Sequence, residues 1–399
     1  MTTGSVYKLV RDDKPVRRKD GSQIWCVDYK DSEGKRVAKS TFRSKREAED
    51  WLASTTVDLK NGVHTPDRDS ITVSEACELW INHVEGLRER STVKQYREHA
   101  ENHIKPRLGE IKLSQLTRAD VRRFETAMRK EVSEAMARKT LASLKALINV
   151  AMDHGKVAQN VALGVTAEST GRKGGEDKVD VADIPSKDEL NAMLAFTQAN
   201  YPAHYPLIYT AAFTGMRPSE WRGLTWENVD LEARTISVTQ RADEWGDIGE
   251  TKTSQSVRTI PIGPKLYGVL AAWKLAQPLP ARVRGFVFPN SKGNPENIQN
   301  LSQRFLSPMQ AGNPKAKEDS PLRKSAGIVG KDGSHKFTFY SFRHFFASVL
   351  IDSGQDVVKV SRLMGHSTPN VTLGVYAHLF DRKVSRQDAA ADMERAVLE

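Results

Sequence analysis

The chain has 399 residues, enough for two or three domains, and its 39% hydrophobic and 28% charged residues are typical of a globular protein. No run of about 18 uncharged apolar residues occurs, which excludes a hydrophobic membrane span, and the N-terminus lacks the apolar core of a signal peptide. We therefore expect a cytoplasmic protein. The formal charge of +10 favours a polyanionic partner, most commonly nucleic acid, although a solvated basic surface would give the same charge.

The basic excess is spread along the chain rather than gathered in one tail. Residues 1–60 contain 14 Lys and Arg against 10 Asp and Glu, and residues 84–145 contain 15 against 9. This distribution predicts several modules that each face an anion, as in a protein that encloses DNA. The two cysteines, Cys26 and Cys77, lie in apolar patterns far apart and are expected to be reduced, buried and structural. We expect neither a metal nor a cofactor.

Residues 5–61 predict a small sheet backed by one helix. Polar and apolar residues alternate over 23–29 and 36–42, around a turn at 31–34, and Ser44 opens a helix that runs to about Leu59. The strands carry or adjoin Lys30, Lys35, Arg36 and Lys39. Such a ribbon could enter a DNA groove, and the alternative is a solvated sheet face. A second basic unit downstream favours the DNA-binding interpretation.

Residues 61–70 have the composition of a linker, and the pattern from Ile71 to about Val165 is entirely helical. The expected helices begin at Ser74, Ser91, Thr117 and Ser133. Their outward faces are basic, through Lys94, Arg97, Arg122, Arg123, Arg138, Lys139 and Lys145. We expect a compact bundle that faces DNA. A coiled coil is the weaker alternative because the helices are too short for repeated heptads.

A second linker is expected over 167–183, and the third unit follows it. Ser186 begins a helix, 205–213 reads as a buried helix, and Pro218 occupies the first turn of another. Residues 234–241 and 256–262 alternate as strands of a small antiparallel sheet with 250–254 near its tip. Helices are expected at about 264–276 and 297–309, followed by a polar loop.

The stretch from Phe339 to His378 combines residues that suit a bound phosphate better than a hydrophobic core. Arg343 and His344 begin an apolar helical run, a second helix ends at Gly365 and His366, and a short segment carries Tyr376. Breaking and rejoining a phosphodiester without a metal requires a nucleophile, cations for the nonbridging oxygens and a proton for the leaving oxygen. These residue types can supply all three.

Together with two upstream segments, this stretch resembles the tyrosine recombinases, or phage-type integrases, especially those of temperate actinobacterial phages. The matching residues are the run 214–220 with Arg217 and Glu220, Lys252 in the expected hairpin, Arg343-His344, and Leu363-Met364-Gly365-His366 with Tyr376 ten positions on. The resemblance implies a multidomain α+β fold in three parts. These are an N-terminal arm-type DNA-binding domain with a small sheet and helix (1–62), an all-helical SAM-like core-binding domain (71–166), and a mostly α catalytic domain with a small antiparallel sheet (180–399).

By this resemblance Tyr376 is the nucleophile that forms a covalent 3′-phosphotyrosine. Arg217 and Arg343 hold the phosphate, for which the planar guanidinium fork is well suited. Lys252 is the general acid, His366 hydrogen-bonds the transition state, and Glu220 supports Arg217. Taken singly, each of these residues could instead be an ordinary surface, capping or core side chain.

One position departs from the family pattern, which has histidine three residues before the second arginine. Here that residue is Tyr340. A phenol can donate a hydrogen bond but is neither a cation nor an efficient base near neutral pH. We hypothesise that Tyr340 contributes a hydrogen bond only; the alternative is that His335 or His344 replaces the missing histidine.

The resemblance predicts an enzyme that integrates phage DNA into a bacterial chromosome. Its implied partners are double-stranded DNA with core-type and arm-type attachment sites, three further copies in a homotetramer, a host DNA-bending protein and an excisionase, with no membrane. A helix over 384–398 could dock on a neighbouring copy or cover its own domain. The alternatives are an integrase of a conjugative element or transposon, a chromosome-dimer recombinase, a type IB topoisomerase, and a non-catalytic DNA-binding regulator.

Overall fold

The computed structural model describes residues 4–11, 14–31, 33–167, 183–251, 253–278, 284–313 and 324–381. The chain divides into two compact units, Met1–Lys173 and Gly174–Glu399. Across the described ranges, none of the helices is both long and apolar enough to cross a membrane. The amphipathic segment expected at 384–398 lies outside the described residues, as does most of the second expected linker.

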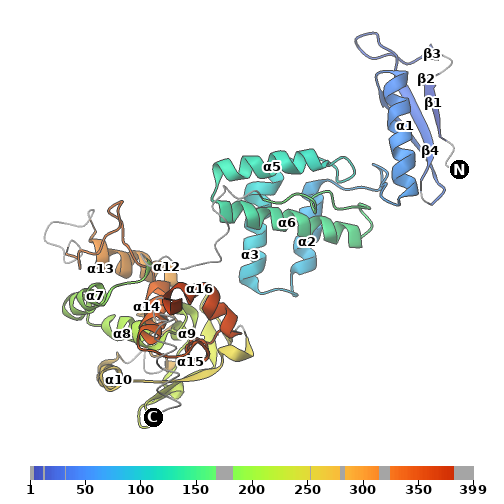
Figure 1. Cartoon of the computed structure of the whole chain (residues 1–399). Helices are drawn as coiled ribbons and strands as arrows, with labels where there is room; N and C mark the ends of the chain where they lie inside the picture. Colours follow the sequence, from blue (N-terminus) through green and yellow to red (C-terminus); the bar gives the residue numbers. More distant parts are fainter. Residues whose placement is uncertain are drawn as a thin grey trace, which may run out of the picture. The chain divides into compact units, whose positions relative to one another are not determined.

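The first unit begins with a three-stranded antiparallel sheet covered on one face by a helix (Figure 1). Its strands are β1 (Ser5–Lys8), β4 (Trp25–Lys30) and β5 (Arg36–Phe42), in the order β1-β4-β5, and its helix is α1 (Lys45–Lys60). A separate pair joins β2 (Val10–Arg11) to β3 (Lys14–Pro15). Ser44 begins α1 by accepting a hydrogen bond from the Glu47 amide at 3.1 Å. The predicted sheet and helix are therefore present.

Three of the four basic residues expected on this sheet form ion pairs within the protein. Arg36 forms an ion pair with buried Asp28, and Lys39 forms one with Asp67 at 2.9 Å between Nζ and Oδ2. Lys35, although exposed, pairs with Glu33 at 2.6 Å between Nζ and Oε2, and Lys30 is exposed. The Lys39 ammonium also lies 4.9 Å from the centre of the Trp51 ring. The sheet face is therefore less uniformly cationic than its sequence suggests.

A helical bundle follows, with a core that includes Trp80, Ile104, Met128, Leu144 and Leu147. Its elements are α2 (Val73–Val84), α3 (Arg90–His99), a π-helical turn (Ala100–Ile104), α4 (Lys105–Leu108), α5 (Arg118–Glu131) and α6 (Glu134–Asp153). Figure 1 shows α2 beside α6, against which it packs. Both cysteines are free and buried, Cys26 in the sheet and Cys77 in α2. The predicted bundle is thus present, including the starts of α5 and α6.

The start of α2 differs from the prediction. Thr72, not Ser74, is the N-cap, because its hydroxyl accepts from the Glu75 amide while the Glu75 carboxylate accepts from the Thr72 amide. This reciprocal pair satisfies two amides that would otherwise lack partners at the helix end. Thr72 has a glutamate three residues later, whereas Ser74 does not.

The segment 61–70, expected to be a plain linker, makes specific contacts within the first unit. The Asp67 carboxylate accepts from Lys39 in β5 and also from Ser114 Oγ at 2.7 Å and Gln115 Nε2 at 3.1 Å. His64 Nε2 lies 2.7 Å from the Tyr29 hydroxyl. The Asp67 carboxylate therefore accepts hydrogen bonds from residues of both the sheet and the bundle.

The second unit is mostly helical around a small sheet. Its helices are α7 (Lys187–Asn200), α8 (Tyr205–Thr214), α9 (Pro218–Arg222), α10 (Pro264–Ala276), α12 (Ile298–Leu301), a π-helical turn (Ser302–Leu306), α13 (Ser307–Ala311), α14 (Phe339–Asp352), α15 (Val357–Met364) and α16 (Pro369–Asp381). Its strands are β6 (Val229–Asp230), β7 (Thr235–Val238), β8 (Gln240–Ala242), β9 (Ile248–Glu250) and β10 (Arg258–Pro261).

The single hairpin expected over 234–262 is divided between two sheets. Strands β10, β7 and β6 form one antiparallel sheet, and β8 pairs with β9 in another. Of the residues expected near the tip, Glu250 ends β9, and Thr251, Thr253 and Ser254 follow it before β10, while residues 243–247 form the turn of the smaller pair. The chain changes sheets at Thr239, between β7 and β8.

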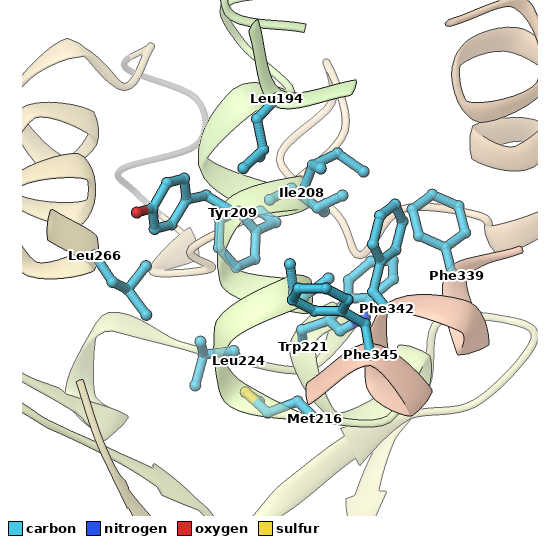
Figure 2. Packing of buried hydrophobic residues seen from close by; sticks show 14 of the residues in the cluster. Leu194, Ile208, Tyr209, Met216, Trp221, Leu224, Leu266, Phe339, Phe342 and Phe345 are labelled. Carbon is cyan, nitrogen blue, oxygen red and sulfur yellow. The ribbon is translucent and has the colours of Figure 1, made fainter. Parts of the chain in front are cut away.

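Helix α14 is the central packing element of this unit because it is apolar on two faces. Phe339, Phe342 and Phe345 belong to the main core, and Figure 2 shows them beside Trp221 and Met216. The rings of Trp221 and Phe339 are 5.3 Å apart. Other α14 residues, Ala347 and Ile351, face a second cluster built with α15 and α16. A residue of α14 that lies between these faces is thereby held in place from both sides.

Candidate functional site

Arg217 is positioned by a tight turn between α8 and α9. Gly215 ends α8 in the left-handed conformation, with φ of 61°, and Pro218 occupies the first turn of α9. A Cβ on Gly215 would lie 2.4 Å from the Phe346 ring, so a side chain there meets both backbone strain and a clash. The turn thus depends on glycine, and it places Arg217 at the N-terminal end of α9.

Glu220 joins two arginines at the centre of the site. Its carboxylate, 2% exposed, accepts from Arg217 Nη1 at 2.7 Å and from Arg258 Nη2 at 2.8 Å and Nη1 at 3.2 Å. It also accepts from the Arg217 backbone amide at 2.8 Å. Burial by itself opposes ionisation, but the bonds and charge of Arg258, with the charges of Arg343 and Arg217, lower the pKa of Glu220 overall. The carboxylate is ionised at neutral pH.

Three consecutive backbone carbonyls at the end of α15 each accept a bond from a different arginine. Arg258 Nε donates to Leu363 O at 2.7 Å, Arg343 Nη2 to Met364 O at 2.6 Å, and Arg217 Nη2 to Gly365 O at 2.7 Å. The last carbonyls of a helix lack intrahelical partners and carry partial negative charge, so cations are favoured there. The end of α15 therefore gathers the three guanidiniums.

Arg343 is the most deeply placed of the three cations. It is 4% exposed, and its Nη1 donates to Gly215 O at the turn before Arg217. Burial lowers the pKa of Arg343 to about 9, with the charge of Arg217 as the next cause. The side chain remains cationic at neutral pH and links the α8–α9 turn to the end of α15.

His366 follows the same helix end and contacts α16. Its Nδ1 lies 2.8 Å from the hydroxyl of buried Thr372. Burial and then the charges of Arg343, Arg217 and Arg258 lower the pKa of His366 to about 3, so the ring is neutral near pH 7. If Nδ1 accepts from Thr372, Nε2 carries the proton and is a donor.

Tyr376 lies in the middle of α16. It is 1% exposed and packs in the cluster that includes Ala347 and Met364. Its hydroxyl lies 2.6 Å from His344 Nδ1. Burial raises the pKa of the phenol, and the charge of Arg343 opposes the rise. The resting tyrosine is therefore protonated.

Five of the six predicted site residues lie in the described part of the chain, and four of them converge. Arg217, Arg343 and His366 meet around the end of α15, and Tyr376 joins them through His344, the neighbour of Arg343. Tyr340, in the first turn of α14, is 52% exposed. Lys252 lies outside the described residues, although Thr253 bonds to Ser256, which accepts from Arg217 Nη1 at 3.3 Å.

Two residues of this arrangement were not among the six predicted site residues, although His344 was named as one possible replacement for the missing histidine. Arg258 is one of several basic residues near the expected hairpin, and only its contacts with Glu220 and Leu363 distinguish it. His344 was noted beside Arg343, but its bond to Tyr376 connects residues 32 positions apart. Arg258 lies in a strand whose polar and apolar residues alternate. A cation on the buried face of such a strand requires an acidic partner, and this requirement could have identified Arg258.

The arrangement is suited to binding an anion that approaches Arg217. Two guanidiniums bond to the Glu220 carboxylate and the charge of a third acts on it, and the two histidines beside them are neutral. Arg217 retains 27% exposure of its side chain, in contrast to 6% for Arg258. The described residues contain no group of three or more His, Cys, Asp and Glu that could hold a metal ion.

Comparison with protein families gives two matches in chain order. Residues 186–383 match the phage integrase family, and residues 72–128 match the SAM-like N-terminal domain of phage integrases. Together these matches cover more than half of the chain. They include every residue that forms the arrangement around the end of α15.

Similar curated proteins are recombinases from bacteria and their mobile elements. A XerC-like tyrosine recombinase of Caldanaerobacter subterraneus is 24% identical over 92% of this chain and 95% of its own. An integrase of Streptomyces ambofaciens is 27% identical over 87% and 86%, and a putative phiRv2 prophage integrase of Mycobacterium tuberculosis is 25% identical over 92% and 93%.

Among solved structures, the fold is similar to two integrases captured with DNA. The Tn1549 transposon integrase in complex with a circular intermediate DNA aligns with a TM-score of 0.61 at 22% identity, over 81% of this chain and 99% of that one. A lambda integrase tetramer bound to a Holliday junction aligns with a TM-score of 0.55 at 16% identity, over 88% and 91%. The predicted fold class, with its SAM-like helical domain and mostly helical C-terminal unit, is confirmed.

Proposed function

Because the chain belongs to the phage integrase family of tyrosine recombinases, we propose that it cleaves and rejoins double-stranded DNA through a 3′-phosphotyrosine at Tyr376. The observation that carries this proposal is the set of three guanidiniums at the end of α15, beside a buried phenol. A phosphodiester is an anion at neutral pH, and its negative charge offsets the excess positive charge of the site. The phosphotyrosine conserves the bond energy, so a free 5′-hydroxyl can reverse the step.

Arg217 and Arg343 are proposed to bind the nonbridging oxygens of the scissile phosphate. A guanidinium has five N–H donors. The hydrogen bonds that Arg217 and Arg343 make to described residues use some of the N–H groups on Nη1 and Nη2. Each residue therefore keeps N–H donors for a phosphate. Their bonds to Gly365 and Met364 fix the forks before DNA arrives, so little reorganisation is needed at the moment of reaction.

Lys252 and His366 are proposed to assist the reaction as proton and hydrogen-bond donors. Lys252 would protonate the leaving 5′ oxygen, and its neighbour Thr253 is connected to Arg217 through Ser256. His366, neutral and held by Thr372, would donate from Nε2 to a nonbridging oxygen. Neither role uses a cofactor or a metal.

Tyr340 is proposed to contribute a single hydrogen bond to the phosphate. Its exposure at the start of α14 is consistent with a residue that meets DNA at the rim rather than one that accepts a buried proton. If Tyr340→Phe cleaves nicked half-sites as fast as the parent, this contribution is absent.

We propose further that the protein acts as a homotetramer on core-type and arm-type attachment sites in the bacterial cytoplasm, at the nucleoid. The sheet of residues 1–62 would bind the arm-type sites, residues 71–166 the core-type sites, and residues 180–399 would carry the chemistry. The element integrated is proposed to be a phage genome, with a host DNA-bending protein and an excisionase as accessory factors. Similarity to the ICEBs1 integrase of Bacillus subtilis and to Tn1549 integrase makes a conjugative element or transposon the second candidate.

The decisive experiment traps DNA on the protein. A library of nicked half-sites, in which cleavage releases a short 5′ fragment that cannot religate, is incubated with the parent and with Tyr376→Phe. We expect a denaturation-resistant adduct with the parent, and DNA binding without an adduct for the variant. Tyr209→Phe, which changes another buried tyrosine of the same unit, is the matched control and should retain the adduct. A parent that binds DNA yet forms no adduct would identify a non-catalytic regulator.

A further inference from the structure

The Tyr376 hydroxyl has one hydrogen-bond partner among the described residues, His344. The two residues come from adjacent helices, α14 and α16, with ring centres 5.8 Å apart and 2.6 Å between Oη and Nδ1. The phenol is 1% exposed, and its body is surrounded by apolar side chains such as Ile351 and Leu379. Any proton that leaves this hydroxyl therefore has His344 as its nearest acceptor.

His344 is in the protonation state required of an acceptor. Burial and then the charge of Arg343, partly opposed by Asp183, lower the pKa of His344 to about 4. The imidazole is therefore neutral near pH 7, with one nitrogen protonated and the other carrying a lone pair. A phenol is a far better hydrogen-bond donor than acceptor beside a neutral ring, which assigns the lone pair to Nδ1 and the proton to Nε2.

His366, His335 and Tyr340 are engaged elsewhere or chemically unsuited as acceptors. His366 uses Nδ1 with Thr372, and His335 Nδ1 lies 3.1 Å from Ser307 Oγ. Tyr340, which replaces the usual histidine, is half exposed and is a poor base at neutral pH. The geometry thus answers a question left open by the sequence: which histidine stands closest to the nucleophile.

Building on the proposed function, we propose that His344 is a catalytic residue that accepts the phenolic proton of Tyr376 during attack on DNA. The Tyr376 Oη–phosphorus bond forms while the phosphorus–5′ oxygen bond breaks. The phenolic proton moves to His344 Nδ1, and the 5′ oxygen takes a proton from the general acid. In rejoining, the 5′-hydroxyl attacks phosphorus and gives its proton back to the general acid, the phosphorus–Oη bond breaks, and Nδ1 returns its proton to Oη.

The bound phosphodiester makes this transfer more favourable than it is in the resting protein. Without DNA, the charge of Arg343 disfavours an imidazolium at the adjacent residue, and the proton stays on Tyr376. A phosphate anion beside Arg343 offsets that charge and thereby stabilises His344 in its protonated form. Coupling of proton transfer to DNA binding would keep the nucleophile inactive until a substrate is in place.

The test measures single-turnover formation of the covalent adduct on a nicked half-site. We expect His344→Ala to slow adduct formation by about 100-fold or more, within the range attributed to general bases. His344→Asn, which keeps a hydrogen-bonding atom near the position of Nδ1, should remain slow because an amide does not accept the proton. His335→Ala is the matched control and should cleave at the parental rate.

Two chemical substitutions separate proton acceptance from packing. Difluorotyrosine at position 376 lowers the pKa of the nucleophile, so it should recover much of the His344→Ala rate. A 5′-bridging phosphorothiolate, whose sulfur leaves without a proton, should rescue Lys252→Ala but not His344→Ala.

The proposal is overturned if His344→Ala cleaves as fast as the parent. It is also overturned if the defect is unchanged by difluorotyrosine, which would indicate a packing role. DNA binding and the melting temperature of each variant establish that it is folded, and His344→Asn serves if the alanine variant is not. Absence of an adduct with the parent protein would instead contradict the proposed function.

Discussion

At the scale of single residues, the site depends on one buried carboxylate that organises several cations. Glu220 is almost fully buried and bonds to both Arg217 and Arg258, and Arg258 itself is 6% exposed. A buried ion pair need not stabilise a protein relative to an apolar substitute, but removal of one partner leaves an uncompensated charge. Arg258 thus acts on Arg217 through Glu220, as a positioning residue.

We predict that Arg258→Met destabilises the second unit and slows DNA cleavage. Loss of one partner of a buried pair costs about 3–5 kcal/mol, and here it also frees the Leu363 carbonyl. Thermal unfolding followed by Trp fluorescence measures the stability, and adduct formation measures cleavage. Arg362→Met, on the exposed side of α15, is the control and should change stability by less than about 0.5 kcal/mol. Equal stability of the two variants would contradict the role given to Arg258.

The two site histidines predict a loss of stability in mild acid. Their pKa values in the folded protein are about 4 for His344 and about 3 for His366, below the unfolded value of about 6.5. Between these values the unfolded chain binds protons that the folded chain does not, so stability is complete above pH 6.5 and falls as pH decreases. Each histidine contributes about 1.4 kcal/mol per pH unit in that interval.

Urea unfolding at pH 7.5, 6 and 5 measures this dependence for the parent and for His366→Gln. The variant should lose the contribution of His366, so its free energy of unfolding should fall less steeply as the pH decreases. A decline of the same steepness in both proteins would mean that His366 does not remain neutral in the folded state.

At the scale of elements, the last turn of α15 is where the site is assembled. Gly365 ends the helix in the left-handed conformation, with φ of 64°, and its carbonyl and the two preceding ones bind three arginines. A Cβ there would lie 2.8 Å from Arg258 Nη1. Glycine therefore serves both the backbone conformation and the approach of the guanidinium.

We predict that Gly365→Ala reduces adduct formation more than its effect on stability explains. The left-handed conformation costs a residue with a Cβ about 1–2 kcal/mol, and the clash additionally displaces Arg258. Gly333→Ala is a matched control because Gly333 has φ of 78° and open space around it. If both variants cleave at parental rates after correction for unfolded protein, the close approach of Arg258 is unimportant for function.

At the scale of the whole molecule, the excess of basic residues is partly neutralised before any DNA binds. In the bundle, Lys105 pairs with Glu78 and Glu101, and Arg107 pairs with Glu131. Arg138 and Lys139, in contrast, are exposed on α6. The net charge of +10 therefore does not describe each face of the protein, because some basic residues are paired with acidic ones and others are exposed.

We predict that Arg138→Ala combined with Lys139→Ala weakens the salt dependence of DNA binding. Each phosphate contact removed should reduce the slope of log K against log salt by about 0.9. Binding is measured by anisotropy in the Tyr376→Phe background, so that cleavage does not interfere. Lys105→Ala, whose cation is already paired, should leave the slope nearly unchanged. An unaltered slope in the double variant would place these residues away from DNA.

The sequence by itself determined those features that arise from local rules and short-range patterns. Helix starts at Ser44, Thr117, Ser133 and Ser186 were predictable because a capping side chain bonds to amides two or three residues away. Strand β5 and helix α10 were predictable from alternation and length. The prediction that Arg217, Arg343, His366 and Tyr376 form the site rests on motifs that occur in the order of the family.

Only the tertiary structure decided which distant residues meet and in what chemical state. It divided the expected hairpin into two sheets. The bonds of Arg258 to Glu220 and Leu363, and the bond between His344 and Tyr376, join positions 32 to 105 residues apart. Burial of Tyr376 and the neutral state of His344 follow from packing of α14, α15 and α16, and no local pattern encodes them. The physical reason is that desolvation and charge act through space, whereas a sequence motif records order along the chain.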